Sequence, residues 1–373
     1  MMSGLLTSKI RKLFLKDLFN PSLFLLLILL LTSNSKLFSQ IDFRGQAVAN
    51  LSMSSFSTIN TVRYIPEIDW IQNDINLNLS PNLTFTNSTN APDFLRPYRA
   101  WIRYTTTYWE WKAGLQKINF GPGKILRSLQ WFDQLDPRDP TNQTTGVWGI
   151  KGKYTSSNNQ SLWGWVLMGN DDLKGKEIFK SDPDLPEIGG RIEYPTGMID
   201  LGITSHLRPL IGTNEDSIPV ELRIGLDGYA EYGIGMWFEN SSSVILNSPL
   251  QPESMVLNTL GIDYTFGIGN GLYLTGEWMS MITQMNDDVR SDNICAIMFS
   301  YPVSWLYNIS SFITYHPKSD LAIVYLSWQR TLDNVIILFS SYKTTEVSLA
   351  SSFFGAQTLP GSSGIQFMLT FNH

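Results

Sequence analysis

The sequence of 373 residues contains only one cysteine, Cys295, and only three histidines, His206, His316 and His373. A single cysteine cannot form a disulfide within the chain, so a disulfide-stabilised scaffold is excluded. Because this cysteine lies far from the N-terminal segment, a lipid-anchored lipoprotein is excluded as well. No two histidines have the spacing of metal ligands, so we expect no metal site built on histidine and no cofactor.

Charged residues are also scarce, at 16% of the chain, and acidic residues outnumber basic ones. Residues 1–39 hold five of the 27 basic residues and one of the 33 acidic residues. The remainder therefore carries 22 basic and 32 acidic residues, a net charge of −10. Proteins that bind nucleic acid present a basic surface. We therefore expect no nucleic-acid partner.

Long apolar runs are missing after residue 40, where no stretch reaches the roughly 18 residues that indicate a transmembrane helix. The chain is nevertheless 43% hydrophobic and 13% aromatic. Its apolar residues must therefore be scattered, and strict alternation with polar residues scatters them. This pattern favours strands over helices.

The first segment has the three parts of a secretory signal peptide. It begins with basic side chains, continues with an almost purely apolar run over residues 22–31, and reaches a small residue at Ser39. The basic residues are Lys9, Arg11, Lys12 and Lys16. A comfortable membrane span needs about 20 residues, and this run is shorter. We predict a signal peptide over residues 1–39, with an uncleaved N-terminal anchor as the alternative.

Alternation of apolar and polar residues recurs along the rest of the chain, for example over residues 98–104, 221–227, 230–239 and 365–372. Period-two patterning places one face in an apolar medium and the other in water or a polar interior. The expected strands are about 9–12 residues long, which suits a tilted membrane strand better than a soluble one. Aromatic residues crowd the strand ends, as interfacial girdles do.

The connections alternate between short turns and longer polar segments. Short turns are expected at 106–107, 157–160, 195–197, 227–228, 267–271, 302–303 and 331–334. Long connections are expected at 87–96, 119–145, 170–186, 208–218, 241–254, 284–292 and 344–362, and one at 316–319 is short. Outer-membrane barrels have short periplasmic turns and longer extracellular loops.

We therefore predict an all-β fold, a transmembrane antiparallel β-barrel of about 18 strands over residues 40–373, located in the bacterial outer membrane. Two weaker strands, near 42–52 and 60–70, complete the count, and Pro66 would interrupt the ladder of the second. Sixteen strands is the alternative. An even number places both termini in the periplasm. Outer-membrane lipid is then an expected partner.

Two parts of the sequence resemble known outer-membrane proteins. GIQFMLTFNH, at the C-terminus, is similar to terminal strands read by the barrel-assembly machinery, although Phe371 is not the last residue. KINFGPGKILRSLQWFDQLDPRDPTNQTTGVWGIKGKY, followed by SLWGWVLMGNDDLKGKE, resembles an uncharacterised porin-like outer-membrane barrel family of Bacteroidota, best over residues 97–207. The resemblance implies an envelope barrel. It brings no substrate and no functional residues.

Phasing the strands assigns charged side chains to the lumen. On the strands before residue 155 the set is dominantly basic, and on later strands it is mixed to acidic, so a transverse field across a pore is expected. The alternative is a charge network that fills the lumen. The predicted pore-lining residues are Arg99, Arg103, Glu110, Lys112, Lys151, Lys153, Arg191, Glu193, Glu221, Arg223, Glu231 and Glu277.

The 119–145 segment is the most distinctive connection, because its length points to a functional role and its aromatic content argues against disorder. We predict that it forms a constriction loop in the lumen. Its charged residues are Arg127, Asp133, Asp136, Arg138 and Asp139. The aspartates could bind calcium, but their spacing is not that of a known calcium loop, and salt bridges to the two arginines are the simpler interpretation.

The function predicted from these features is a porin-like channel for passive diffusion of small polar solutes. An enzyme is not expected, because the adjacent Ser205 and His206 point to opposite faces of a strand and cannot form a dyad. The alternative is a non-conducting barrel that supports a multiprotein envelope complex. Exposed apolar residues would favour such partners. They are Val244, Ile245, Leu246, Phe353 and Phe354.

Overall fold

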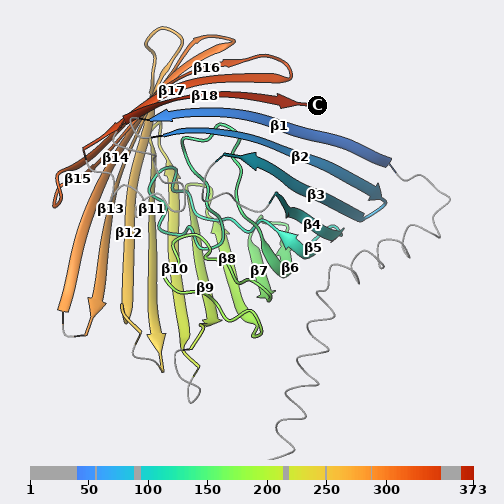
Figure 1. The fold of residues 1–373 in the computed structure, drawn as a ribbon. Coiled ribbons are helices and arrows are strands. Elements are labelled where there is room, and N and C mark those ends of the chain that lie inside the picture. The colour runs from blue at the N-terminus through green and yellow to red at the C-terminus, as the bar shows by residue number, and fades with distance from the viewer. Residues whose placement is uncertain are drawn as a thin grey trace, which may run out of the picture.

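The computed structural model describes residues 40–54, 57–87, 94–212, 218–247, 250–286, 288–345 and 363–373. These residues form one sheet of 18 antiparallel strands that closes on itself (Figure 1). No helix in these ranges has the length and apolarity needed to cross a membrane. The signal-peptide prediction for 1–39 and the residues Phe353 and Phe354 lie outside the described residues.

Every strand is hydrogen-bonded to its neighbours in sequence. The strands are β1 (Gln40–Ser54), β2 (Thr58–Gln72), β3 (Ile75–Thr86), β4 (Leu95–Thr105), β5 (Trp109–Gln116), β6 (Val147–Thr155), β7 (Ser161–Leu167), β8 (Glu187–Pro195), β9 (Ile199–Pro209), β10 (Val220–Glu231), β11 (Gly235–Leu246), β12 (Ser254–Phe266), β13 (Leu272–Met285), β14 (Asp288–Ser304), β15 (Tyr307–His316), β16 (Leu321–Thr331), β17 (Val335–Thr344) and β18 (Ser363–Asn372).

The barrel closes where β1 meets β18. Their register runs from Gln46 opposite Asn372 to Ser54 opposite Gly364. Beyond it, Gly45 and His373 exchange two backbone hydrogen bonds of 3.0 Å each. The prediction of 18 strands is confirmed and the alternative of 16 is wrong. Closure leaves no unpaired sheet edge, as a membrane-spanning sheet requires.

Side chains alternate between the two faces of each strand. On β9, Leu201, Ile203 and Leu207 are exposed on the outside, whereas Thr204 and His206 between them are buried. The same alternation continues around the wall, so the outer surface carries a band of exposed apolar side chains. A polar interior and an apolar exterior are the arrangement of a transmembrane barrel.

The turn predicted at 227–228 is wrong. Asp-Gly is a strong hairpin signal, yet β10 continues to Glu231 and the turn lies at 232–234. Asp227 is needed inside the barrel, where it binds the guanidinium of Arg191. Gly228 leaves room for the Phe238 ring, which lies 2.4 Å from where a Cβ at this position would stand.

Three other connections also differ from the prediction. The long connection expected at 241–254 covers only residues 247–253, because β11 continues to Leu246. The turn expected at 302–303 lies at 305–306, because β14 continues past Pro302 through an irregularity in its pairing with β15. The long connection expected at 284–292 is short, since β13 ends at Met285 and β14 begins at Asp288. Backbone pairing continues there through polar residues, because ladder hydrogen bonds do not depend on apolar side chains.

Pro66 interrupts the ladder as predicted. The pairing of β2 with β3 stops at Tyr64 opposite Leu83 and resumes at Ile68 opposite Leu79. On its other side, Pro66 lies opposite Gly45 of β1. The missing N–H of proline is thereby placed at a break between strands rather than inside a continuous ladder.

The connections divide into two sets at opposite ends of the barrel. At the turn end, the connections after β2, β4, β6, β8, β10, β12, β14 and β16 are two to five residues long. At the loop end, most connections are longer, and the two longest with described residues throughout follow β5 and β7. The start of β1 and the end of β18 both lie at the turn end.

Candidate functional site

The connection between β5 and β6, residues 117–146, folds into the barrel instead of extending away from it (Figure 1). It contacts the wall on several sides, through Gly123 with β11, Lys124 with β13 and Thr144 with β4. Backbone inside a barrel must find hydrogen-bond partners, and here wall side chains supply them. This inserted segment, the 119–145 loop with its flanking residues, is the centre of the candidate site.

Two wall carboxylates hold the loop. Glu277 on β13 accepts hydrogen bonds from the backbone N–H groups of Lys124 (2.7 Å), Ile125 (3.0 Å) and Leu126. Glu239 on β11 accepts them from Gly123 (2.7 Å) and Leu129 (3.0 Å). Both carboxylates are buried. Five backbone N–H groups of the loop thus find their acceptors on these two side chains, so the contacts fix the loop to one side of the wall.

Glycine makes the close approach to Glu239 possible. Gly121 has φ +88°, a conformation that L side chains rarely adopt, and a Cβ there would lie 2.4 Å from Glu239 Oε1. A Cβ on Gly123 would lie 2.8 Å from the same oxygen. The FGPGK sequence therefore lets the backbone reach the carboxylate without a side chain in between.

Apolar packing fixes the next part of the loop against β6, β7 and β9. Trp131 and Phe132 are buried beside Trp165, and the Phe132 and Trp165 rings meet edge to face at 5.6 Å. His206 is enclosed in the same cluster, with Trp165 Nε1 donating to its Nδ1 at 3.2 Å and Glu187 at 3.0 Å from its Nε2. The histidine acts here as a structural group.

A second apolar cluster reaches the opposite wall. Ile125 and Leu126 of the loop belong to it, together with side chains of β13 to β17 such as Met279, Phe312 and Tyr342. The loop also contacts β1 and β2, next to the place where β1 closes on β18, which we call the seam. Arg63 of β2 donates to Thr141 Oγ1 at 3.3 Å, and Gln143 donates to Gln46 of β1. The loop therefore crosses the lumen.

The charged residues of the loop pair mainly with one another. Arg127 lies 2.7 Å from Asp133, and Arg138 Nη2 lies 2.6 Å from Asp136. Asp139 accepts hydrogen bonds from the backbone N–H (2.8 Å) and hydroxyl (2.6 Å) of Thr141. The aspartates are thus engaged by arginine and by the loop itself, and within the described residues no group of three acidic, histidine or cysteine side chains is arranged to hold a metal ion.

The predicted pore-lining residues all lie on the inward face of their strands, opposite the exposed apolar side chains. Three basic residues form a row across β4, β5 and β6, because Lys112 is opposite Arg103 on one side and Lys151 on the other. Glu110 is the carboxylate nearest to this row, 3.8 Å from Arg103 and 3.7 Å from Lys151. Like charges directly opposite each other repel.

Lys112 is the least compensated member of this row. Among the residues that the structure describes, it forms no ion pair with a carboxylate, and its Nζ lies 3.7 Å from the centre of the Trp101 ring. Arg99, at the loop-end side of the row, has a different role. Its Nη2 donates to the carbonyl of Thr144 at 2.9 Å and so holds the returning part of the loop.

The inward charges from β8 to β10 are compensated. Arg191 binds Asp227 through two hydrogen bonds of 2.6 and 2.9 Å and also binds Glu193 at 2.9 Å. Arg223 binds Glu221 at 2.9 Å. Glu231 lies at the turn end, where Tyr229 donates to it at 3.4 Å. The transverse field stays a prediction, and the basic row, not this sector, is where unpaired charge would produce it.

Sequence reasoning missed two features of the site. Glu239 was not among the predicted lumen residues, although it shares the inward face of β11 with Trp237. The connection from 168 to 186 also enters the network, because Glu177 lies 3.3 Å from Arg208 and 3.5 Å from Arg223. The glycines of FGPGK were the one signal that a close backbone contact was required.

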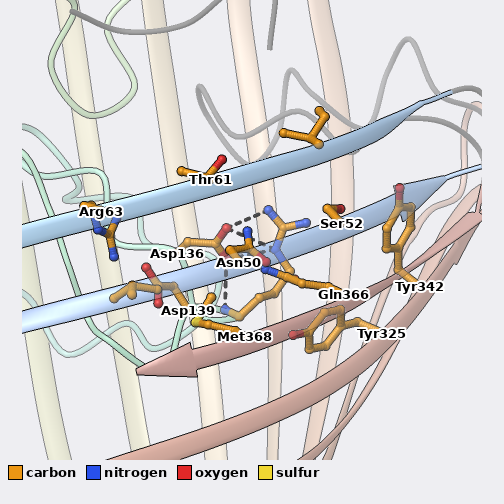
Figure 2. A pocket seen from close by; sticks show the side chains of 13 residues that line it. Asn50, Ser52, Thr61, Arg63, Asp136, Asp139, Tyr325, Tyr342, Gln366 and Met368 are labelled. Carbon is orange, nitrogen blue, oxygen red and sulfur yellow. Dashed lines mark hydrogen bonds and ion pairs between the residues drawn. The ribbon is translucent and has the colours of Figure 1, made fainter. Parts of the chain in front are cut away.

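A pocket of about 250 Å³ remains between the loop and the seam of the barrel. Figure 2 shows Asn50 of β1, Arg63 of β2 and Gln366 of β18 around it, with Asp136 and Asp139 contributed by the loop. Tyr325 of β16 and Tyr342 of β17 line it at the right of the view. The pocket therefore combines amide, hydroxyl, charged and aromatic groups.

No protein-family model matches the sequence. No curated protein matches it significantly either. Three solved structures are similar to the chain at a TM-score of 0.57. One is Wzi from Escherichia coli, described as an outer membrane protein involved in group 1 capsule assembly and as a carbohydrate-binding β-barrel. It has 11% identity, and the match covers 88% of this chain and 84% of that one.

The other two are OccAB1 from Acinetobacter baumannii and OccD3 (OpdP) from Pseudomonas aeruginosa. OccAB1 has 8% identity, with 91% of this chain and 98% of that chain covered. OccD3 has 9% identity, with 89% and 91% covered. At such low identities the likeness concerns the fold alone. The chain has the closed 18-stranded antiparallel fold of outer-membrane β-barrels.

Proposed function

We propose that this protein is a porin-like channel of the bacterial outer membrane for passive diffusion of small polar solutes, narrowed by the 119–145 loop. The observation that carries the proposal is the loop held across the lumen by Glu239 and Glu277. Barrels of 16–18 strands are wide enough for an aqueous channel, and an inserted loop reduces this width to a constriction. The proposed role is passive and needs neither catalysis nor a cofactor.

The orientation in the membrane follows from the connections. Short turns face the periplasm in outer-membrane barrels, so the turn end and both termini would be periplasmic. Residues 1–39 would be removed as a signal peptide during export. The band of exposed apolar side chains would contact lipid, and the barrel-assembly machinery would insert the chain.

The row formed by Arg103, Lys112 and Lys151 gives the channel its proposed ion preference. It lies on the inward face near the turn end, where the only nearby carboxylate described is Glu110. Uncompensated positive charge in a narrow aqueous passage attracts anions and repels cations. We therefore expect a weak preference for anions.

Conductance in planar lipid bilayers tests the proposal. Folded wild-type protein should produce stepwise increases of current, and the variant Glu239→Ala with Glu277→Ala should produce larger or more frequent steps. Each sample must first show the heat-dependent electrophoretic mobility of a folded barrel. If neither protein conducts although both are folded, the channel proposal is wrong.

A second candidate is a non-conducting barrel that supports an envelope complex. It is favoured by the two apolar clusters inside the lumen, which a freely open pore would not contain. The fold likeness to Wzi, a barrel involved in capsule assembly, also supports it. This candidate predicts a silent bilayer together with partners that co-purify in fixed proportion.

A further inference from the structure

The pocket of about 250 Å³ beside the loop carries the inference. We infer that it binds one small, neutral, polyhydroxylated solute with the dimensions of a single sugar ring. The inference names the solute class for the proposed channel and rests on that function.

Three polar atoms of the lining have no hydrogen-bond partner among the described residues, although all three are buried. They are Asn50 Oδ1, an acceptor, Arg63 Nε, a donor, and the hydroxyl of Tyr325, which can donate or accept. Asn50 and Arg63 line the pocket from adjacent strands, β1 and β2 (Figure 2). Buried polar atoms without partners are rare, because their loss of water is not compensated. A solute in the pocket would compensate it.

One orphan acceptor and one orphan donor together specify the chemistry of that solute. An ionised carboxylate group can only accept, so it would satisfy Arg63 and leave Asn50 without a donor. A hydroxyl group both donates and accepts. A molecule with several hydroxyl groups can therefore satisfy both atoms at once, and Gln366 offers a further amide on the same wall.

The charges around the pocket balance. Arg63 and Arg138 contribute two positive charges, and Asp136 and Asp139 contribute two negative charges. Arg138 is already bound to Asp136, with Nη2 at 2.6 Å and Nε at 2.9 Å from carboxylate oxygens. No excess charge of either sign faces the solute, so a neutral solute fits better than an ion.

The apolar part of the lining suits the C–H faces of a sugar. Tyr325 and Tyr342 present aromatic rings to the right of Asn50 in Figure 2, and Met368 lies opposite Asn50 in the register of β1 and β18. The volume equals the share of about eight water molecules in the liquid. This space is suited to one ring with its hydroxyl groups and not to an extended chain.

The test is binding measured by saturation-transfer NMR on the folded full-length protein in detergent. The probes are methyl glycosides that differ in the configuration of their ring hydroxyls, with glucuronate and inorganic phosphate as anionic probes. We expect at least one neutral glycoside to bind saturably, and Asn50→Leu with Gln366→Leu to weaken it at least tenfold. Asn76→Leu, an inward asparagine outside the pocket, is the matched control.

Three results would overturn the inference. They are the absence of binding by every glycoside, equal binding by the wild type and the Asn50→Leu/Gln366→Leu variant, and tighter binding of an anionic probe that Arg63→Gln abolishes. Heat-dependent mobility shows whether each variant is folded. An unfolded double variant is replaced by the single variants Asn50→Leu and Gln366→Leu, which are judged by the same tenfold criterion.

Conductance separates this inference from the channel proposal. Glycoside binding in detergent with a silent bilayer would leave the pocket assignment standing and reject the channel. Stepwise conductance without any glycoside binding would leave the channel proposal standing and reject the pocket assignment.

Discussion

The carboxylate of Glu277 on β13 accepts a hydrogen bond of 2.7 Å from the backbone N–H of Lys124, a residue 153 positions earlier in the chain. The same carboxylate binds the N–H groups of Ile125 and Leu126 and the indole of Trp237 at 3.0 Å. One side chain of the wall is thus the hydrogen-bond acceptor for three consecutive backbone N–H groups of the inserted loop. This contact is one of those that hold the loop across the lumen.

Removing this carboxylate should release the loop. Glu277→Ala leaves three backbone N–H groups of the loop and the indole N–H of Trp237 without this acceptor, and an unsatisfied buried group costs about 1–3 kcal/mol. We expect trypsin to cleave the variant after Lys124 or Arg127, giving fragments that begin at Ile125 or Ser128, because the buried loop becomes accessible. Mass spectrometry of the fragments measures this.

The control for this experiment is Asp288→Asn, an exposed carboxylate on β14. It removes the same charge without touching the loop, so its digestion pattern should equal that of the wild type. Protection of the loop in Glu277→Ala equal to that in the wild type would show that apolar packing alone holds it.

Reversing the charge of Lys112 should move ion preference toward cations. Lys112 lies between Arg103 and Lys151 in the register, so Lys112→Glu also relieves repulsion and should not destabilise the barrel. A unit charge about 4 Å from a passing ion contributes about 1 kcal/mol in water, which corresponds to roughly a fivefold change in local ion concentration. The reversal potential in a KCl gradient measures the shift.

Lys343→Glu, on the outward face of β17, provides the matched control, since it changes the total charge equally but lies outside the lumen. We prefer Lys112 over Arg99, because replacing Arg99 would also remove its hydrogen bond to Thr144 of the loop. An unchanged reversal potential in Lys112→Glu would contradict the assignment of the basic row to the conduction path.

Truncating Asp227 should destabilise the barrel. Its carboxylate binds the buried guanidinium of Arg191 at 2.6 and 2.9 Å, so Asp227→Ala leaves a buried positive charge without its main partner. Breaking such a pair costs about 3–5 kcal/mol. We expect a lower urea midpoint in unfolding from lipid vesicles. The exposed Asp200→Ala should unfold like the wild type, and equal midpoints for both variants would refute the argument.

Removing the last two residues should weaken the seam. His373 exchanges two backbone hydrogen bonds with Gly45, and its ring lies 3.0 Å from the hydroxyl of Tyr64. At about 1 kcal/mol per hydrogen bond, the loss is a few kcal/mol. A chain ending at Phe371 should therefore show a lower urea midpoint. The variant Tyr64→Phe, which removes only the side-chain contact, should show a smaller decrease.

Much of the barrel could be predicted because its signals are local. In each strand, as in residues 365–372, the alternation of apolar and polar residues indicates which face contacts lipid and which faces the interior. Side chains two residues apart point to the same face, so the signal is local. The strand count followed from it. The turn at 227–228 was wrong because Asp227 and Gly228 serve partners on other strands, Arg191 and Phe238, which no local signal reveals.

The candidate site was less accessible to sequence reasoning. The predicted constriction loop and its arginine–aspartate contacts are local enough to be expected, since Arg138 and Asp136 are only two residues apart. The role of Glu239 was missed because its partners Gly123 and Leu129 are more than a hundred residues away. An inward carboxylate looks the same in sequence whether it faces water or a loop.

The sequence by itself determined the class of the protein: the scarcity of cysteine and charge, the absence of long apolar runs and the period of two permit an outer-membrane barrel and little else. Only the tertiary structure decided how the lumen is filled. Loop placement depends on contacts such as Glu277 with Lys124 and Arg63 with Thr141, which arise when the sheet closes and distant residues become neighbours. Local periodicity determines which side chains of a strand point inward and which point outward. Closure of the barrel determines which distant residues those side chains contact.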